Sequence, residues 1–345
     1  MGVYAIPSPP LNPAGFGNLN SRSTPQLIQQ TDAPWNLQRI SSRVTTVPIN
    51  GNITGLTYTY RYDQASRGEG VDVYIVDSGV DFQHPEFEGR AKMILTIDPQ
   101  GRGDASGHGT FVAGVVGSKS FGIAKNVNIF GAGINYGGDQ DLVNSTRAID
   151  AVIAHNKERR TRADFRGAVM NLSWGFDRST LEASHAAGFS GFDNKTIDAL
   201  RTAIRRASEA GIHITVTPGN DNADACDNFP ATFVQDVPSL ISVGNTDITD
   251  TRASNSGWGR CVDMYAPGSE VTSTFLLGFG VQEVNSGTSF AAPAVAGVIA
   301  GELIRRPDLM LKPQEMKKHI LSIGMKGAVK DARGGGNVLL NTGIF

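Results

Sequence analysis

The sequence predicts an α/β fold in which a mostly parallel β-sheet is covered by helices on both faces. Strand-like runs rich in β-branched and aromatic residues occur at residues 71–80, 126–134, 167–175, 212–220 and 240–246. Between them lie segments with apolar residues at helical spacing, at residues 109–118, 142–158 and 194–211. Strands that alternate with helices form βαβ units, and these place their strands in parallel.

Composition excludes several classes of partner. Of 345 residues, 40% are hydrophobic and 19% are charged, which is typical of a soluble globular protein. The formal net charge is −2, so no global field attracts nucleic acid or anionic lipid. No apolar run reaches the roughly 18 residues that span a bilayer. We therefore expect neither a nucleic-acid partner nor a membrane partner.

The chain is expected to contain one folded domain. Residues 1–28 are rich in Pro, Gly, Ser, Asn and Gln and have little periodicity, which predicts a flexible N-terminal arm or a precursor remnant. Residues 29–345 then form the domain. The first residues lack a basic patch followed by an apolar segment, so no export leader is visible.

Three side chains of catalytic type stand where a parallel sheet places its site, beyond the carboxyl ends of strands. Asp77 ends the strand "VDVYIVD" at residues 71–77, and His108 stands between two glycines at the start of the apolar helix. Ser289 stands at the entrance of a helix in "GTSFAAPAVAG". We expect Pro293 in or beside the first turn of that helix, because a proline deep inside costs about 3 kcal/mol.

This set of residue types fits acyl transfer. A serine hydroxyl needs an imidazole to take its proton, and the imidazole needs a carboxylate to fix its tautomer. Asn220, with Gly219 beside it, and the Ser289 backbone N–H could stabilise the oxyanion. Taken singly, each residue has a structural alternative: Asp77 and Asn220 could hold turns, His108 could lie in the core, and Ser289 could be an N-cap.

Five motifs in order resemble those of the subtilase family: "VYIVDSGV", "GHGTFVAGVVGS", "NLSWG", "TPGNDNADA" and "NSGTSFAAPAVAGV". The proteinase K branch is the most similar, through "TDAPWNLQRIS" and "HPEFEGRA". The resemblance implies a subtilisin-like peptidase domain over residues 29–345 and a serine endopeptidase activity. It assigns Ser289 as nucleophile, His108 as general base and then acid, Asp77 as orienting residue and Asn220 as oxyanion donor.

The resemblance also implies a cleft that binds the substrate as an extended strand, with Ser173, Trp174 and Gly175 along one side. Trp174 replaces a smaller apolar residue and is expected to narrow or reshape the pockets. Phe111 and Ala294 replace family histidines, which suggests altered packing behind the site. Residues 176–195 are additional to the family pattern and either gate the cleft or form a neutral surface insertion.

Further features follow from the resemblance. Cys226 and Cys261 occupy positions where some relatives carry a disulfide, although two free buried thiols are the alternative. A disulfide would favour an extracellular, secreted protein over an intracellular one. No cofactor is needed for the chemistry, but Asp247 and the carbonyls of Pro230 and Thr232 could hold structural Ca²⁺. The tripeptide at 102–104 is interpreted as part of a loop.

We therefore predict a monomeric serine endopeptidase that acts on protein or peptide substrates through an acyl-enzyme intermediate. Two alternatives stay open. One is a precursor-maturation protease of narrow specificity, which the additional segment and Trp174 favour. The other is a catalytically silent subtilase fold that serves as a binding module, which Phe111, Ala294 and Trp174 favour.

Overall fold

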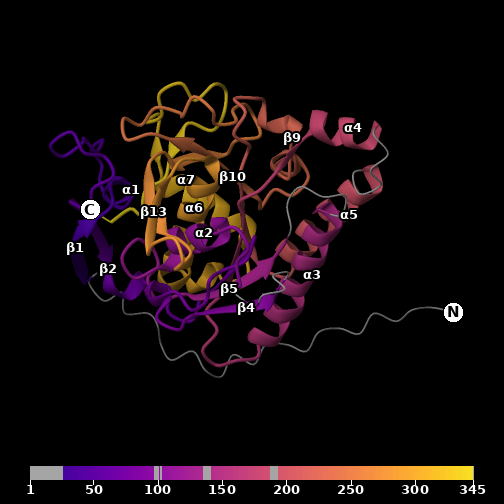
Figure 1. Ribbon diagram of the computed structural model, residues 1–345, viewed down its shortest axis with the longest axis horizontal. Coiled ribbons are helices and arrows are strands. Elements are labelled where there is room, and N and C mark those ends of the chain that lie inside the picture. The colour runs from indigo at the N-terminus through magenta and orange to yellow at the C-terminus, as the bar shows by residue number, and fades with distance from the viewer. Residues whose placement is uncertain (1–25, 97–100, 102, 135–140, 187–192, 345) are drawn as a thin grey trace.

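The computed structural model describes residues 26–96, 101, 103–134, 141–186 and 193–344 (Figure 1). These residues contain a nine-stranded sheet of order β14-β15-β11-β10-β8-β6-β3-β5-β4. Every neighbouring pair in it is parallel except β14 with β15. The predicted α/β fold is thus confirmed. The strands of this sheet are β3 Asp72–Asp77, β4 Ala91–Leu95, β5 Asn128–Gly133, β6 Ala168–Leu172, β8 His213–Val216, β10 Ile241–Thr246, β11 Met264–Pro267, β14 Met325–Lys326 and β15 Val338–Leu339.

Three antiparallel pairs lie outside the central sheet. The N-terminal strand β1 pairs with β2, the short strand β7 pairs with β9, and β12 forms a hairpin with β13. The pair β1–β2 begins two residues before the predicted domain boundary at 29. Most of the predicted arm, residues 1–25, lies outside the described residues. The bounds are β1 Leu27–Ala33, β2 Tyr58–Asp63, β7 Phe176–Asp177, β9 Asn228–Phe229, β12 Val271–Thr274 and β13 Gln282–Asn285.

Helices cover both faces of the sheet (Figure 1). Side chains alternate along β3, so that Val73 and Ile75 pack into a core with α2 and α6, while Tyr74 and Val76 pack into a second core with α3 and α5. Both faces are apolar because both are covered. The helices are α1 Trp35–Ile40, α2 His108–Gly117, α3 Asp141–Arg159, α4 Arg178–Ala186, α5 Asn194–Glu209, α6 Thr288–Arg305 and α7 Pro313–Ile323.

The central helix α6 contains its proline further in than predicted. Pro293 is the sixth residue of the helix, in the second turn. Its missing N–H would have bonded to the carbonyl of Ser289, four residues earlier. The Ser173 hydroxyl fills this place and donates to the Ser289 carbonyl at 2.7 Å. The proline therefore leaves the Ser289 carbonyl free as an acceptor. The hydrogen bond from Ser173 to this carbonyl joins the end of β6 to the first turn of α6.

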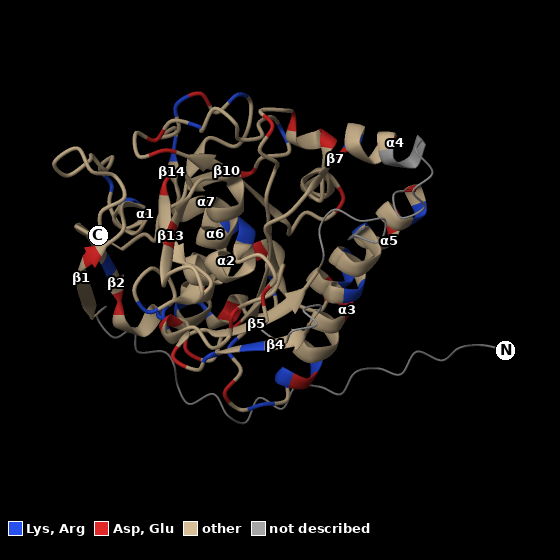
Figure 2. Ribbon diagram, viewed as in Figure 1, with Lys and Arg blue, Asp and Glu red and all other residues tan. Residues whose placement is uncertain are grey.

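Charged side chains of both signs are spread over the outer elements, whereas α2 carries none (Figure 2). This distribution agrees with the small net charge of −2. In the described part of the chain, no helix is both long and apolar enough to cross a bilayer.

Candidate active site

The pair Asp77–His108 is built where β3 ends and α2 begins. Asp77 is the last residue of β3 and is fully buried, and its Oδ1 accepts a 2.8 Å hydrogen bond from His108 Nδ1. His108 is the first residue of α2, after Gly107, whose φ of +88° suits glycine. The contact fixes the imidazole with Nε2 directed away from the carboxylate. His108 Nε2 can then act as a base.

The environment of His108 favours its protonated form. Burial disfavours the imidazolium, but the charge of Asp77, its hydrogen bond and the charge of Asp104 outweigh burial and raise the pKa of His108 above its ordinary value. A raised pKa makes the imidazole a stronger base and stabilises the ion pair that forms when it takes a proton.

Asp104 was missed as a site residue, because the sequence placed it only in a loop. Its carboxylate is 1% exposed and accepts five hydrogen bonds, which come from the hydroxyls of Ser78 and Thr110 and the backbone N–H groups of Ser106, Gly107 and Thr110. The carboxylate thus offsets the partial positive charge of the N-terminus of α2. It also links this end of the helix to Ser78, the residue that follows Asp77. An Asp four residues before the first residue of an apolar helix was the signal that could have identified this cap.

The nucleophile candidate Ser289 is the second residue of α6 and is 8% exposed. Its hydroxyl donates to the Ser173 carbonyl at 3.1 Å, and no hydrogen bond joins it to His108 among the residues that the structure describes. The two helices nonetheless meet here, because the His108 ring centroid lies 5.7 Å from that of Phe290. Phe290 also packs on Phe111 at 4.4 Å, so the packing behind the site is apolar.

Asn220 follows β8 and lies beside the start of α6. Its Oδ1 accepts hydrogen bonds from the Thr288 backbone N–H at 2.9 Å and from the Thr288 hydroxyl at 3.0 Å. With the oxygen held in this way, the exposed side chain keeps its NH₂ group as the donor. The N–H of Ser289 has no carbonyl four residues earlier in the helix. The Asn220 side chain and the Ser289 N–H therefore both lie at the entrance of α6.

The sheet and the loop after β8 supply two walls beside these donors. Ser173 and Gly175 follow β6, and Gly219 precedes Asn220 with a φ of +95°. The Trp174 side chain packs inward, since the residue is 5% exposed and its Nε1 donates to the Val76 carbonyl at 2.9 Å, and its expected effect of narrowing or reshaping the pockets stays a prediction.

The additional segment 176–195 contains β7 and α4, while residues 187–192 lie outside the described part. β7 pairs with β9, with Phe176 opposite Phe229 and Asp177 opposite Asn228. Under α4 there is a cavity of about 240 Å³ lined by Arg178, Leu181, Glu182, Asp193, Asn194, Ile197 and Phe229. The segment thus follows residues 173–175 directly in the chain.

The predicted disulfide is present between Cys226 and Cys261, with a Cα–Cα separation of 5.2 Å. It braces the loop that carries Asn220. In the same loop, Gly219 O accepts from Gly257 N at 3.0 Å, and Asn222 N donates to Asn255 O at 2.7 Å. The disulfide and the hydrogen bonds together hold the loop that carries Asn220 against residues 255–261.

Structural calcium at the predicted ligands Asp247, Pro230 and Thr232 is not shown, and oxygen atoms of Asp247 and Pro230 have local hydrogen-bond partners. Asp247 Oδ1 accepts hydrogen bonds from Thr249 and Thr251, and the Pro230 carbonyl accepts one from Phe233 N. Within the described ranges, no group of three or more His, Cys, Asp or Glu side chains could hold a metal ion. The predicted oxygen ligands thus stabilise local turns.

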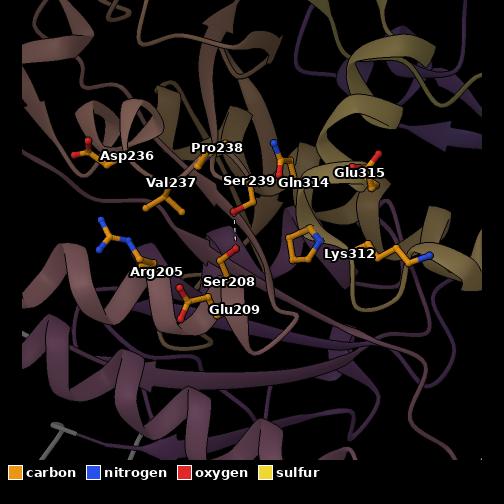
Figure 3. A pocket seen from close by; sticks show the side chains of 11 residues that line it. Arg205, Ser208, Glu209, Asp236, Val237, Pro238, Ser239, Lys312, Gln314 and Glu315 are labelled. Carbon is orange, nitrogen blue, oxygen red and sulfur yellow. Dashed lines mark hydrogen bonds between the residues drawn. The ribbon is translucent and has the colours of Figure 1, made fainter. Parts of the chain in front are cut away.

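A second, larger cavity of about 460 Å³ lies at the opposite edge of the sheet. It is bordered by the end of α5, the residues before β10 and the start of α7, with Ser208 and Ser239 bonded to each other (Figure 3). Since Ser239 precedes β10, this cavity is near the amino ends of the strands. The candidate site is at their carboxyl ends.

Comparisons with known proteins agree with this arrangement. Residues 68–336 match the model of the subtilase family of S8 peptidases. Similar proteins include subtilisin-like protease 3 of Saccharomyces cerevisiae, 32% identical over 88% of this chain and 59% of the relative, and alkaline protease 2 of Aspergillus fumigatus, 32% identical over 88% and 58%. The chain thus spans under two thirds of these relatives.

A solved structure shows the same fold. The crystal structure of a cold adapted subtilisin-like serine proteinase is 32% identical and superposes with a TM-score of 0.69, over 90% of this chain and 98% of the other. From the family match and these relatives, this chain belongs to the subtilase family.

Proposed function

We propose that this chain is a serine endopeptidase that hydrolyses peptide bonds through an acyl-enzyme intermediate. The observation that carries the proposal is the 2.8 Å contact from His108 to buried Asp77, beside a helix entrance that presents Ser289. Protein or peptide substrates fit the segment after β6, where Gly175 is exposed and an extended chain could add as a strand. The Cys226–Cys261 bond supports an extracellular location.

In the proposed reaction the Ser289 hydroxyl first turns from the Ser173 carbonyl toward His108. Rotation about the Cα–Cβ bond moves Oγ between staggered positions without moving the helix. His108 Nε2 then takes the proton while Oγ attacks the substrate carbonyl, and Asn220 and the Ser289 N–H donate to the oxyanion. His108 next protonates the leaving amine, and the same residues activate water to release the acid.

The hydroxyl orientation in this structure also fits the alternative of a catalytically silent binding module, since Ser289 bonds to Ser173 and not to His108. The two functions differ in reactivity toward a fluorophosphonate, which reacts only with an activated serine. A serine peptidase is labelled stoichiometrically at Ser289, and a silent fold is not.

The test is fluorophosphonate labelling of the full chain, followed by peptide mapping and by hydrolysis of a peptide anilide. We expect label on Ser289, no label in His108→Ala, and a loss of kcat of about 10⁴-fold or more in Ser289→Ala. Ser269→Ala, which changes a serine outside the site, should keep both activities. Absence of labelling in a protein with native circular dichroism would contradict the endopeptidase.

A further inference from the structure

Four asparagines of the chain stand in the tripeptide Asn-X-Ser/Thr, which is the acceptor sequence for N-linked glycans. They are Asn52, Asn144, Asn171 and Asn194. The tripeptide alone is a weak signal, because a glycan also needs an accessible amide nitrogen and room outside the folded chain. The structure distinguishes the four sites, since the amide and the hydroxyl have different partners in each.

The tripeptide at Asn171 is closed to a glycan. Asn171 lies in β6 and is fully buried. Its Oδ1 accepts a hydrogen bond from Thr215 at 2.9 Å, and its Nδ2 donates to Ser173 at 2.8 Å. The hydroxyl of the tripeptide is that of Ser173, which donates in turn to a backbone carbonyl of α6. A sugar on this nitrogen would have to lie inside the core.

The tripeptides at Asn144 and Asn194 lie in the helices α3 and α5. Residues two apart on a helix do not face each other, so the hydroxyl is directed away from the asparagine amide. In α3 the Thr146 hydroxyl donates to the carbonyl four residues earlier at 2.8 Å. In α5 the Thr196 hydroxyl donates to the Asp193 carbonyl at 2.8 Å. Both hydroxyls are thus bonded to backbone.

At Asn52 the amide and the hydroxyl of the tripeptide face each other. Asn52 is exposed in the loop between α1 and β2, which projects from the edge of the molecule (Figure 1). Its Oδ1 accepts hydrogen bonds from the Thr54 N–H at 3.0 Å, the Thr54 hydroxyl at 3.4 Å and the Gly55 N–H at 3.0 Å. This is an Asx turn. Its contacts span four residues, so it can form before the rest of the chain folds.

The nitrogen of Asn52 is open to a reagent from solvent. Among the residues that the structure describes, Nδ2 donates no hydrogen bond, because the partners of this side chain are all on Oδ1. A Cβ built on Gly55 would lie 2.9 Å from Nδ2, so glycine at this position leaves the nitrogen uncovered. The buried Tyr58 donates its hydroxyl to the Asn52 carbonyl at 2.7 Å and fixes the backbone from the core side.

We propose that Asn52, and none of the other three asparagines, accepts an N-linked glycan when the chain enters the secretory pathway. The inference rests on the proposed extracellular location and is independent of the peptidase chemistry. Nδ2 forms a bond to the anomeric carbon of an oligosaccharide carried on a lipid diphosphate. The bond from that carbon to the diphosphate oxygen breaks, the lipid diphosphate leaves, and a base of the transferase takes one Nδ2 proton.

The test is translation of the full chain, fused behind a cleavable signal sequence, in the presence of microsomes. The Ser289→Ala variant is used throughout, so that self-cleavage cannot obscure the product. We expect one gel shift that endoglycosidase reverses, with the glycan mapped to Asn52 by mass spectrometry. Asn52→Gln and Thr54→Ala should each lose the shift completely, whereas Thr54→Ser keeps the hydroxyl and should keep the shift.

Gly55→Val tests the turn itself, because it leaves the tripeptide intact and places a side chain against Nδ2. It should lose most of the shift. Asn144→Gln and Asn194→Gln are the matched controls and should keep the single shift. A chain without a shift, or a shift that persists in Asn52→Gln, overturns the proposal. A full shift in Gly55→Val, or a second shift that either control removes, overturns selection by the turn.

Failure of this proposal can be told apart from failure of the proposed function. The fused signal sequence delivers the chain to the transferase whatever its natural location, and the Ser289→Ala chain has no nucleophile. The gel shift therefore reports only whether Asn52 is an acceptor. Fluorophosphonate labelling of the unmodified chain reports the peptidase chemistry separately.

Discussion

At the scale of single residues, the buried carboxylate of Asp104 should control the pH at which His108 works as a base. Its negative charge helps to raise the pKa of His108, after the larger effects of burial and of Asp77. Asp104→Asn removes that charge, so the pKa of His108 should fall and the neutral imidazole should persist to lower pH. We expect the acid limb of kcat/KM against pH to move to lower pH.

The dependence of kcat/KM on pH distinguishes the electrostatic effect of Asp104 on His108 from its effect on the stability of α2. Loss of the cap alone would lower the free energy of unfolding by about 0.5–2 kcal/mol and would leave the position of the limb unchanged. Asp198→Asn, at an exposed carboxylate on α5 that pairs with Arg201, serves as control. An acid limb of Asp104→Asn that coincides with that of the unmodified chain, or lies above it, would contradict the prediction.

How well the sequence predicted a residue depended on where its partners are. Asp77, His108, Ser289 and Asn220 stand in local motifs beside strand ends or helix starts, and the parallel sheet brings such positions to one edge. By contrast, the burial of the Trp174 ring follows from tertiary packing around Val76, which its position after a strand does not indicate.

At the scale of elements, a buried chain of hydrogen bonds joins the sheet to α6. Thr215 of β8 donates to Asn171 of β6, Asn171 donates to Ser173, and Ser173 donates to the Ser289 carbonyl that Pro293 leaves free. Ser173→Ala removes the middle of this chain and leaves two buried polar groups unpaired. We expect the free energy of unfolding, measured in urea, to fall by about 1–3 kcal/mol.

Ser242→Ala is the matched control for Ser173→Ala. Ser242 is also fully buried in a strand of the same sheet, but its hydroxyl has no hydrogen-bond partner in the described residues. Removing an unpaired hydroxyl relieves a desolvation cost, so this variant should be neutral or more stable. If the two alanine variants lose the same stability, the loss reflects volume and the hydrogen-bond chain contributes nothing.

At the scale of the whole molecule, the Cys226–Cys261 bond should supply a large share of the net stability. It links residues 35 positions apart, and closing a loop of that length in the unfolded chain stabilises the fold by about 4 kcal/mol in the chain-entropy model. Folded domains have only about 5–15 kcal/mol in total. The double variant Cys226→Ser/Cys261→Ser should therefore lose about 4 kcal/mol in urea unfolding, and the unmodified chain under reductant should show the same loss.

The same disulfide also holds the segment that carries Asn220, the proposed oxyanion donor. Its loss should therefore lower the reactivity of Ser289 under conditions in which the molecule is still folded. Gly257 N still donates to Gly219 O and Asn222 N still donates to Asn255 O when the disulfide is absent, and these hydrogen bonds are then the main restraint on that loop. We expect the rate of fluorophosphonate labelling at Ser289 to fall under conditions where far-UV circular dichroism is still native. Labelling at an unchanged rate in the double variant would mean that these hydrogen bonds position Asn220 without the disulfide, and that the bond acts only on the unfolded chain.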